Sequence, residues 1–227
     1  MMDNPLLALA IPSLLVVPAM GLLSRISAKS PFATEVRRKA LHVAVGLAAL
    51  SFPLFLTTPA MVLTAVAAVL AWMVAVRLVP VLRIRFGCVL HDARRKSYGD
   101  IYFAFAIACL LMLPRPTPAL YAAPLLILTV ADAAAAIAGR RWPRGELHGP
   151  ARGKTLTGCV VFGVTAFLVT ASLLTWFGPV TGPRVIAISF VTAAITAYTE
   201  AFSPRGFDNL TVPAVAWLVI FTTTAGV

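Results

Sequence analysis

The stretch Ile127–Trp142, ILTVADAAAAIAGRRW, places a single aspartate, Asp132, inside an otherwise apolar helical segment. A charged side chain within a membrane costs about 2.5–3.5 kcal/mol or more, so it is a functional candidate by default. The alternative is an aspartate that pairs with a neighbouring arginine only for packing. The segment therefore raises two questions: whether the chain lies in a membrane, and what Asp132 does there.

The composition is that of an integral membrane protein. Of the 227 residues, 60% are hydrophobic and only 12% are charged, whereas a soluble domain carries about 25% charged residues. The net charge of +11 does not indicate a nucleic-acid partner, because a basic binding face needs more polar surface than this chain has. We expect an all-α polytopic protein with a single transmembrane domain over residues 1–227 and no soluble domain.

A helix needs about 20 apolar residues to cross the hydrocarbon core. The sequence predicts about eight such helices, with seven as the alternative, and prolines and glycines fall mostly at their ends. The predicted segments are Pro5–Leu23, Lys39–Phe55, Pro59–Leu82, Tyr98–Leu113, Ala119–Gly139, Gly158–Phe177, Arg184–Phe202 and Asn209–Gly226.

The basic residues predict the orientation of these helices. With eight spans, sixteen basic residues fall on one side and two, Arg115 and Arg184, on the other. The positive-inside rule makes the basic side cytoplasmic and puts both termini outside, so we expect a multi-pass protein of the cell (inner) membrane. The cytoplasmic loops would be about 24–38, 83–97, 140–157 and 203–208. The sixteen residues are Arg25, Lys29, Arg37, Arg38, Lys39, Arg83, Arg85, Arg94, Arg95, Lys96, Arg140, Arg141, Arg144, Arg152, Lys154 and Arg205.

The acidic residues and histidines gather on the same side, which the positive-inside rule does not require. We therefore expect a functional site at the cytoplasmic face. The residues concerned are Glu35, Asp92, Asp100, Asp132, Glu146, Glu200 and Asp208, with His42, His91 and His148.

Several of these candidates have structural alternatives. Glu35, Arg38 and His42 share one helical face, although they would also fit a juxtamembrane cap of charge. Asp100 opens a short helix and could simply complement its dipole. Asp208 and Asn209 could cap the last helix. Glu200 ends a helix, where the dipole disfavours an acid, so we expect a cation close to it.

The loop GRRWPRGELHGPARGKTLTG, residues 139–158, combines glycines with basic residues. Backbone amides freed by glycine, together with Lys and Arg, suit a polyphosphate. Part of it nearly matches a P-loop, but His148 replaces the first glycine, and the required strand and helix are absent. Lys154 and Thr155, just before a helix, nevertheless remain a suitable phosphate site.

Four motifs in order, RRKALHVAVG, SYGD, DAAAAIAG followed by GKTLTG, and EAFSPRGFDNLTVP, resemble those of the phytol kinase/dolichol kinase family. The resemblance runs from about Glu35 to Pro213. It implies a membrane enzyme that phosphorylates an isoprenoid alcohol such as phytol, farnesol or a polyprenol, typically with CTP and a divalent cation such as Mg²⁺. Pro143 stands where dolichol kinases usually have a second glycine, and Thr157 where they have an acid, which favours the phytol-kinase-like branch.

The resemblance also assigns roles, and these leave alternatives open. Asp132 would bind metal or orient the alcohol, and Glu200 would join it as a metal ligand. His42, Asp100, Glu200 and Asp208 are candidates for the base or the remaining metal ligands. The nucleotide-binding residues would be Arg38, Lys39, Ala135, Gly139, Arg140, Arg141, Gly153, Lys154, Thr155, Gly158, Asp208 and Asn209. The lipid alcohol would come from the bilayer and the nucleotide, which is CTP, UTP or ATP, from the cytosol.

Three other functions compete with this reading: a CTP-dependent diacylglycerol kinase, a cytidylyltransferase that makes CDP-lipids, and a transporter. A cytidylyltransferase would normally carry an H-G-G-x-x-D-R-like signature near its C-terminus, where this chain has GFDNLTVP. Transporters usually place charges near the membrane midplane and often contain inverted repeats, and neither pattern is found here. The sequence does not indicate an oligomeric state.

Overall fold

The computed structural model describes residues 5–25, 30–90, 98–115, 117–148, 153–204 and 206–225. The helices group into two compact units, Met1–Met112 and Leu113–Val227. The single transmembrane domain over residues 1–227 stays a prediction. Some residues of the predicted cytoplasmic face lie outside the described parts, namely Lys29, His91, Asp92, Arg94, Arg95, Lys96, Arg152 and Arg205.

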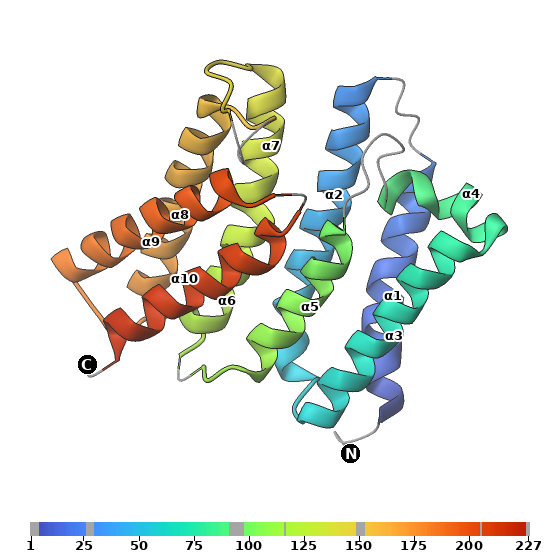
Figure 1. The fold of residues 1–227 in the computed structure, drawn as a ribbon. Coiled ribbons are helices and arrows are strands. Elements are labelled where there is room, and N and C mark those ends of the chain that lie inside the picture. The colour runs from blue at the N-terminus through green and yellow to red at the C-terminus, as the bar shows by residue number, and fades with distance from the viewer. Residues whose placement is uncertain are drawn as a thin grey trace. The chain divides into compact units, whose positions relative to one another are not determined.

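The secondary-structure elements described in the first unit are all helices (Figure 1). Its core includes Met20, Leu41, Val76 and Phe86, contributed by four different helices. The elements are α1 (Pro5–Ser24), α2 (Pro31–Ala49), the short 3₁₀ helix Phe52–Leu54, α3 (Pro59–Leu78), α4 (Pro80–Leu90) and α5 (Gly99–Met112).

The second unit is built around α8, which packs against its neighbours in sequence, α7 and α9, while α10 packs against α9 and α6 (Figure 1). Its elements are α6 (Ala119–Leu126), a π-helical turn (Ile127–Ala131), α7 (Asp132–Arg141), α8 (Leu156–Phe177), α9 (Pro183–Phe202) and α10 (Asp208–Thr224). Alanines dominate one part of its core, among them Ala131, Ala135 and Ala166 around Phe162. Small residues of this kind let helices approach closely.

Proline fixes where several helices begin, because its missing N–H costs nothing in the first turn. Pro31 and Pro59 each occupy the first helical position. The hydroxyls of the preceding Ser30 and Thr58 accept hydrogen bonds from the backbone N–H groups three residues further on, from Ala33 at 3.1 Å and Met61 at 3.3 Å. The N-cap at residue 30 corrects one prediction. Residues 31–38, expected in a cytoplasmic loop, form the first turns of α2.

Two other predicted boundaries differ from the structure. The predicted helix Pro59–Leu82 ends at Leu78. A separate helix, α4, begins at Pro80 and covers the last residues of that predicted helix and part of the predicted loop 83–97. The predicted helix Ala119–Gly139 contains Pro124, which cannot donate a helical hydrogen bond, and a π-helical turn follows it directly before Asp132.

A helical membrane protein is supported, whereas a count of eight spans is not. By length and composition alone, four of the described helical segments could cross a membrane: Pro59–Leu78, Ala119–Arg141, Leu156–Phe177 and Pro183–Phe202. The apolar helix Gly99–Met112 is shorter. The eight predicted segments all coincide with helices, so the sequence located the helices better than it counted the spans.

Small residues allow α7 and α8 to cross closely. A Cβ atom added to Gly139 would lie 2.7 Å from Thr155 Oγ1, and one added to Gly158 would lie 3.2 Å from the Ala135 carbonyl oxygen. Thr155 is itself fixed, because its hydroxyl accepts the Gly158 N–H at 3.1 Å as the N-cap of α8. The motif residues Ala135, Gly139 and Gly158 therefore have a packing role, whatever else they do.

We expect Gly139→Ala to destabilise the second unit by about 1–3 kcal/mol, because the added methyl group overpacks a close contact. Thermal unfolding in detergent would measure the loss. The matched control is Gly163→Ala on α8, where the new Cβ would meet only Ala197 Cβ at 3.7 Å, an ordinary contact. Equal melting temperatures for the two variants would contradict the proposed crossing. Adding Thr155→Ala to Gly139→Ala should recover part of the loss.

Candidate functional site

Three carboxylates meet in the second unit, two of them at helix ends and Asp132 within the continuous helical segment Ala119–Arg141. Asp132 opens α7, Glu200 lies in the last turn of α9, and Asp208 opens α10. Each offers an oxygen atom, and these atoms all lie within 4.8 Å of one another. Asp132 and Glu200 are buried, with exposed fractions of 8% and 7%. Such a group of like charges is costly to bury unless cations balance it.

Lys154 supplies one such cation. Its ammonium nitrogen lies 2.7 Å from Glu200 Oε1 and 3.0 Å from Asp208 Oδ2, and it also donates to the main-chain oxygen of Glu200. The cation expected close to Glu200 is therefore present, 46 residues away in sequence. Burial lowers the pKa of Lys154, but Asp208 and Glu200 raise that pKa by more, so that it lies above its ordinary value. Lys154 is consequently a cation at neutral pH.

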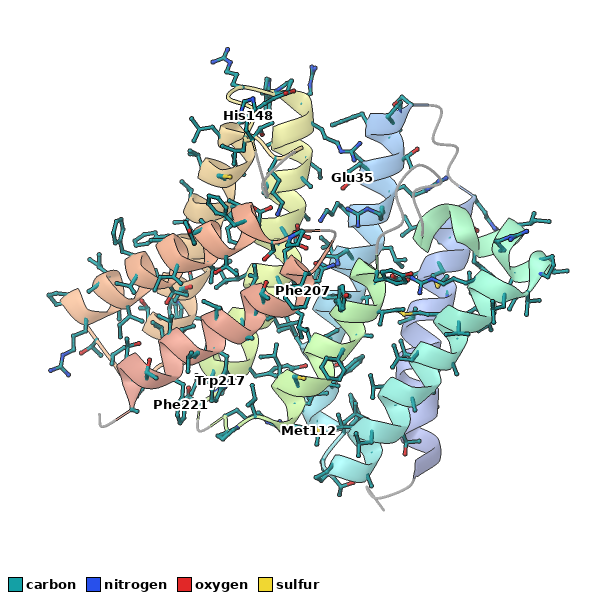
Figure 2. The ribbon with its side chains drawn as sticks, viewed as in Figure 1. Glu35, Met112, His148, Phe207, Trp217 and Phe221 are labelled. Carbon is teal, nitrogen blue, oxygen red and sulfur yellow. The ribbon has the colours of Figure 1, made fainter. Side chains whose placement is uncertain are left out.

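The loop between α7 and α8 holds Lys154 in place through a short hairpin. Glu146 and Thr155 form an isolated antiparallel bridge. The Leu147 N–H donates to the Lys154 carbonyl at 2.9 Å, so the backbone of Lys154 is held in the hairpin. Gly145, which precedes Glu146 in the chain, has a φ of 66°, a left-handed conformation that glycine adopts without strain. Figure 2 labels His148, which lies in this loop.

Four further predicted residues lie close to members of this cluster in sequence, with different surroundings. Asn209 follows Asp208 and is buried, and its N–H donates to Asp208 Oδ1 at 3.1 Å. Arg140 and Arg141 are exposed in the last turn of α7, where cations suit the helix dipole. Gly153 immediately precedes Lys154 and has a φ of 88°.

The remaining predicted residues belong to the first unit. Arg38 binds Glu35 through its guanidinium at 2.6 Å, as their spacing of three along α2 allows. Lys39 is buried, and the His42 ring lies against Phe103 with centroids 4.0 Å apart. The structure thus brings Asp132, Lys154, Glu200 and Asp208 together within one unit, and separately describes Arg38, Lys39, His42 and Asp100 in the other.

Asp100 has a partner that the sequence analysis did not identify. Its two carboxylate oxygens accept hydrogen bonds from Arg77 at 2.8 and 3.0 Å, and the same guanidinium lies 5.4 Å from the centroid of the Tyr98 ring. The signal that could have revealed this pair was Arg77 itself, a lone cation near the end of an apolar helix, which needs an anion.

The three carboxylates of the second unit fit a hard divalent cation. Their donors are all oxygen atoms, the ligands that Mg²⁺ and Ca²⁺ prefer. A cationic group, the Lys154 ammonium, already lies between two of them. Asp132, Glu200 and Asp208 are therefore the described residues that could hold a metal.

Comparison with curated proteins gives one relevant relative. The chain is 32% identical over 211 residues to a protein named phytol kinase from Synechocystis sp. (strain ATCC 27184 / PCC 6803 / Kazusa). The alignment covers 89% of this chain and 85% of the relative. No protein-family model matches the chain, and no solved structure does.

The Arg77–Asp100 pair can be tested as a unit. We expect Asp100→Asn and Arg77→Met each to lower the melting temperature and the double variant to lower it by less than the sum, with a coupling of about 0.5–3 kcal/mol. The reason is that either single change leaves one largely buried charge without its partner. Arg83→Met, which removes an exposed cation of the same unit, is the control. Additive losses would show that the pair does not act together.

Proposed function

Because the chain belongs to the phytol kinase/polyprenol kinase family, we propose that it transfers the γ-phosphate of CTP to the hydroxyl group of an isoprenoid alcohol. A bond forms between the alcohol oxygen and the γ-phosphorus, and the bond from that phosphorus to the β–γ bridging oxygen breaks. The alcohol proton passes to a base, and CDP leaves. Phytol, farnesol and polyprenols are the candidate acceptors.

The observation that carries the proposal is the carboxylate cluster of the second unit with its lysine. Phosphoryl transfer requires little covalent chemistry from the protein and depends on positioning and charge compensation. Asp132, Glu200 and Asp208 would hold Mg²⁺, which would neutralise charge on the nucleotide phosphates. The nucleotide from water and the alcohol from the bilayer would meet at this cluster, because Glu200 and Asp208 lie at helix ends and Asp132 lies within the apolar segment Ala119–Arg141.

The cations of the second unit supply the rest of the proposed phosphate site. Arg140 and Arg141 are exposed at the end of α7, and Lys154 lies in the loop that follows. The backbone at Gly153 adds a left-handed turn that can aim N–H groups toward an anion. Thr155 and Asn209 complete the proposed nucleotide contacts, although the Thr155 hydroxyl already caps α8.

The roles of the first-unit residues rest on the family resemblance alone. It implies nucleotide binding for Arg38 and Lys39, and it leaves His42, Asp100, Glu200 and Asp208 as candidates for the base. Asp100 is better explained as the partner that orients Arg77, because both of its oxygens accept hydrogen bonds from that side chain.

The reaction class can be tested with nucleotides labelled at different phosphates. Purified protein would be incubated with γ-labelled or α-labelled CTP, UTP or ATP and with phytol, farnesol, a polyprenol, diacylglycerol or phosphatidic acid. Transfer of γ-label to an isoprenoid alcohol is the expected result. Transfer to diacylglycerol would show a diacylglycerol kinase. Incorporation of α-label into a lipid formed from phosphatidic acid would show a cytidylyltransferase, and no transfer at all would leave transport as the alternative.

Asp132→Asn tests the central carboxylate. We expect turnover to fall by about two orders of magnitude or more, because the change keeps the volume of the side chain but removes charge that is needed in the transition state. The melting temperature, measured on the same preparation, should change little. Glu146→Gln, an equivalent change at an exposed loop carboxylate, should leave turnover unchanged. A folded Asp132→Asn protein with near-normal turnover would remove Asp132 from the mechanism.

The orientation is tested by two single cysteines at opposite ends of α8. We propose that the loop before α8 is cytosolic and that both chain termini are external, as the basic residues predict. In a background without the three native cysteines, an impermeant maleimide should label Thr181→Cys in intact cells. Glu146→Cys should react only after permeabilisation. The reverse pattern would overturn the orientation.

A further inference from the structure

Lys154 has no spare hydrogen-bond donor in the position that it occupies. A lysine ammonium has three donors, and those of Lys154 are used by Glu200 Oε1, Asp208 Oδ2 and the Glu200 main-chain oxygen. From this position the ammonium cannot also bind a phosphate. The structure therefore shows a state in which Lys154 binds carboxylates. Binding of a phosphate, the role that the sequence predicts for Lys154, would require a second state.

The two carboxylates that hold the Lys154 ammonium are also two of the three that a divalent cation would require. Glu200 and Asp208 hold the ammonium at 2.7 and 3.0 Å, and both belong to the group of three carboxylates whose oxygens could share a metal. An ammonium and a divalent cation held by the same two carboxylates would repel each other strongly at that distance. A metal must displace the ammonium in order to bind there.

We propose that the Lys154 ammonium occupies the divalent-cation position of the second unit, and that metal binding displaces this ammonium toward the nucleotide phosphates. The metal-exchange step stands on the geometry alone, whereas the destination of the ammonium rests on the proposed kinase function. With no metal bound, the ammonium balances part of the negative charge of the carboxylates. The exchange also makes the cation for phosphate available only when the metal has arrived.

The surroundings restrict this movement to the side chain. The Lys154 carbonyl accepts the Leu147 N–H in the hairpin, and the next residue, Thr155, is fixed as the N-cap of α8. The lysine stem, with four flexible carbons, can redirect its ammonium without moving this backbone. The carboxylates lie on helices, so they stay where they are while the cation changes.

The exchange predicts that removing the lysine charge tightens metal binding. Mn²⁺ binding would be measured on purified protein by electron paramagnetic resonance, without nucleotide or lipid. We expect Lys154→Met and Lys154→Gln to bind Mn²⁺ at least about tenfold more tightly than the unsubstituted protein, because no ammonium has to be displaced. Arg144→Met removes an exposed cation from the same loop and should change the affinity by less than about twofold, since solvent screens that charge.

The glutamine variant keeps the measurement decisive if the methionine variant does not fold. Its amide can still donate to the carboxylates, which lessens the cost of burying them without a cation. Folded neutral variants that bind Mn²⁺ no more tightly than the unsubstituted protein would overturn the proposal. Because this measurement uses no substrate, it is independent of whether the protein is a kinase.

Nucleotide binding tests the second half of the proposal. Without a divalent cation, the unsubstituted protein and Lys154→Gln should bind CTP equally weakly, because Lys154 is held by the carboxylates. With Mg²⁺, the unsubstituted protein should bind CTP about tenfold or more tightly than the variant. A difference of the same size with and without Mg²⁺ would show that Lys154 reaches the nucleotide without being displaced, and would overturn the exchange.

Discussion

The close approach of three carboxylates, two of them buried, is the constraint on which the second unit depends. At close range inside a protein, like charges repel strongly, and each charge also loses its hydration. Lys154 offsets part of this cost through two ion pairs, at 2.7 Å to Glu200 and 3.0 Å to Asp208. Glu200 needs this partner most, because it lies at the C-terminal end of α9, where the helix dipole opposes a negative charge. Asp208, in the first turn of α10, is favoured by its helix dipole instead.

The ion pairs explain two features that lie apart in the sequence, the glycines of the loop before α8 and the small residues between α7 and α8. Lys154 must reach two helices from a loop that joins two others, so the loop returns on itself as a hairpin, with glycine at Gly145 and Gly153. The hairpin can end directly on α8 only because α7 and α8 approach closely, which the small residues Gly139 and Gly158 permit. The glycines at 139 and 158 and the carboxylate cluster are therefore structurally dependent on one another.

The positions of the helices and the three carboxylates could be predicted from the sequence. Hydrophobic segments bounded by proline located the helices, and polar residues in apolar surroundings identified Asp132, Glu200 and Asp208. The Lys154 pairs could not be predicted individually, because they join residues 46 and 54 positions apart. The expectation that Glu200 needs a cation came from the helix dipole, a local rule, and it was confirmed. The π-helical turn before Asp132 and the packing role of Gly139 arise from backbone geometry that composition does not encode.

The division between helices and loop has a consequence for how charge can be rearranged in this unit. A carboxylate on a packed helix has its backbone fixed by neighbours on several sides, and α9 packs against both α8 and α10. Lys154 is held at its backbone by the hairpin, but its ammonium lies at the end of a long flexible stem. If charge has to move when another cation or an anion arrives, the lysine can move at far lower cost than the acids. The arrangement therefore favours a fixed anionic site with an exchangeable internal cation, which is what a site needs if it is to stay folded both with and without a bound metal.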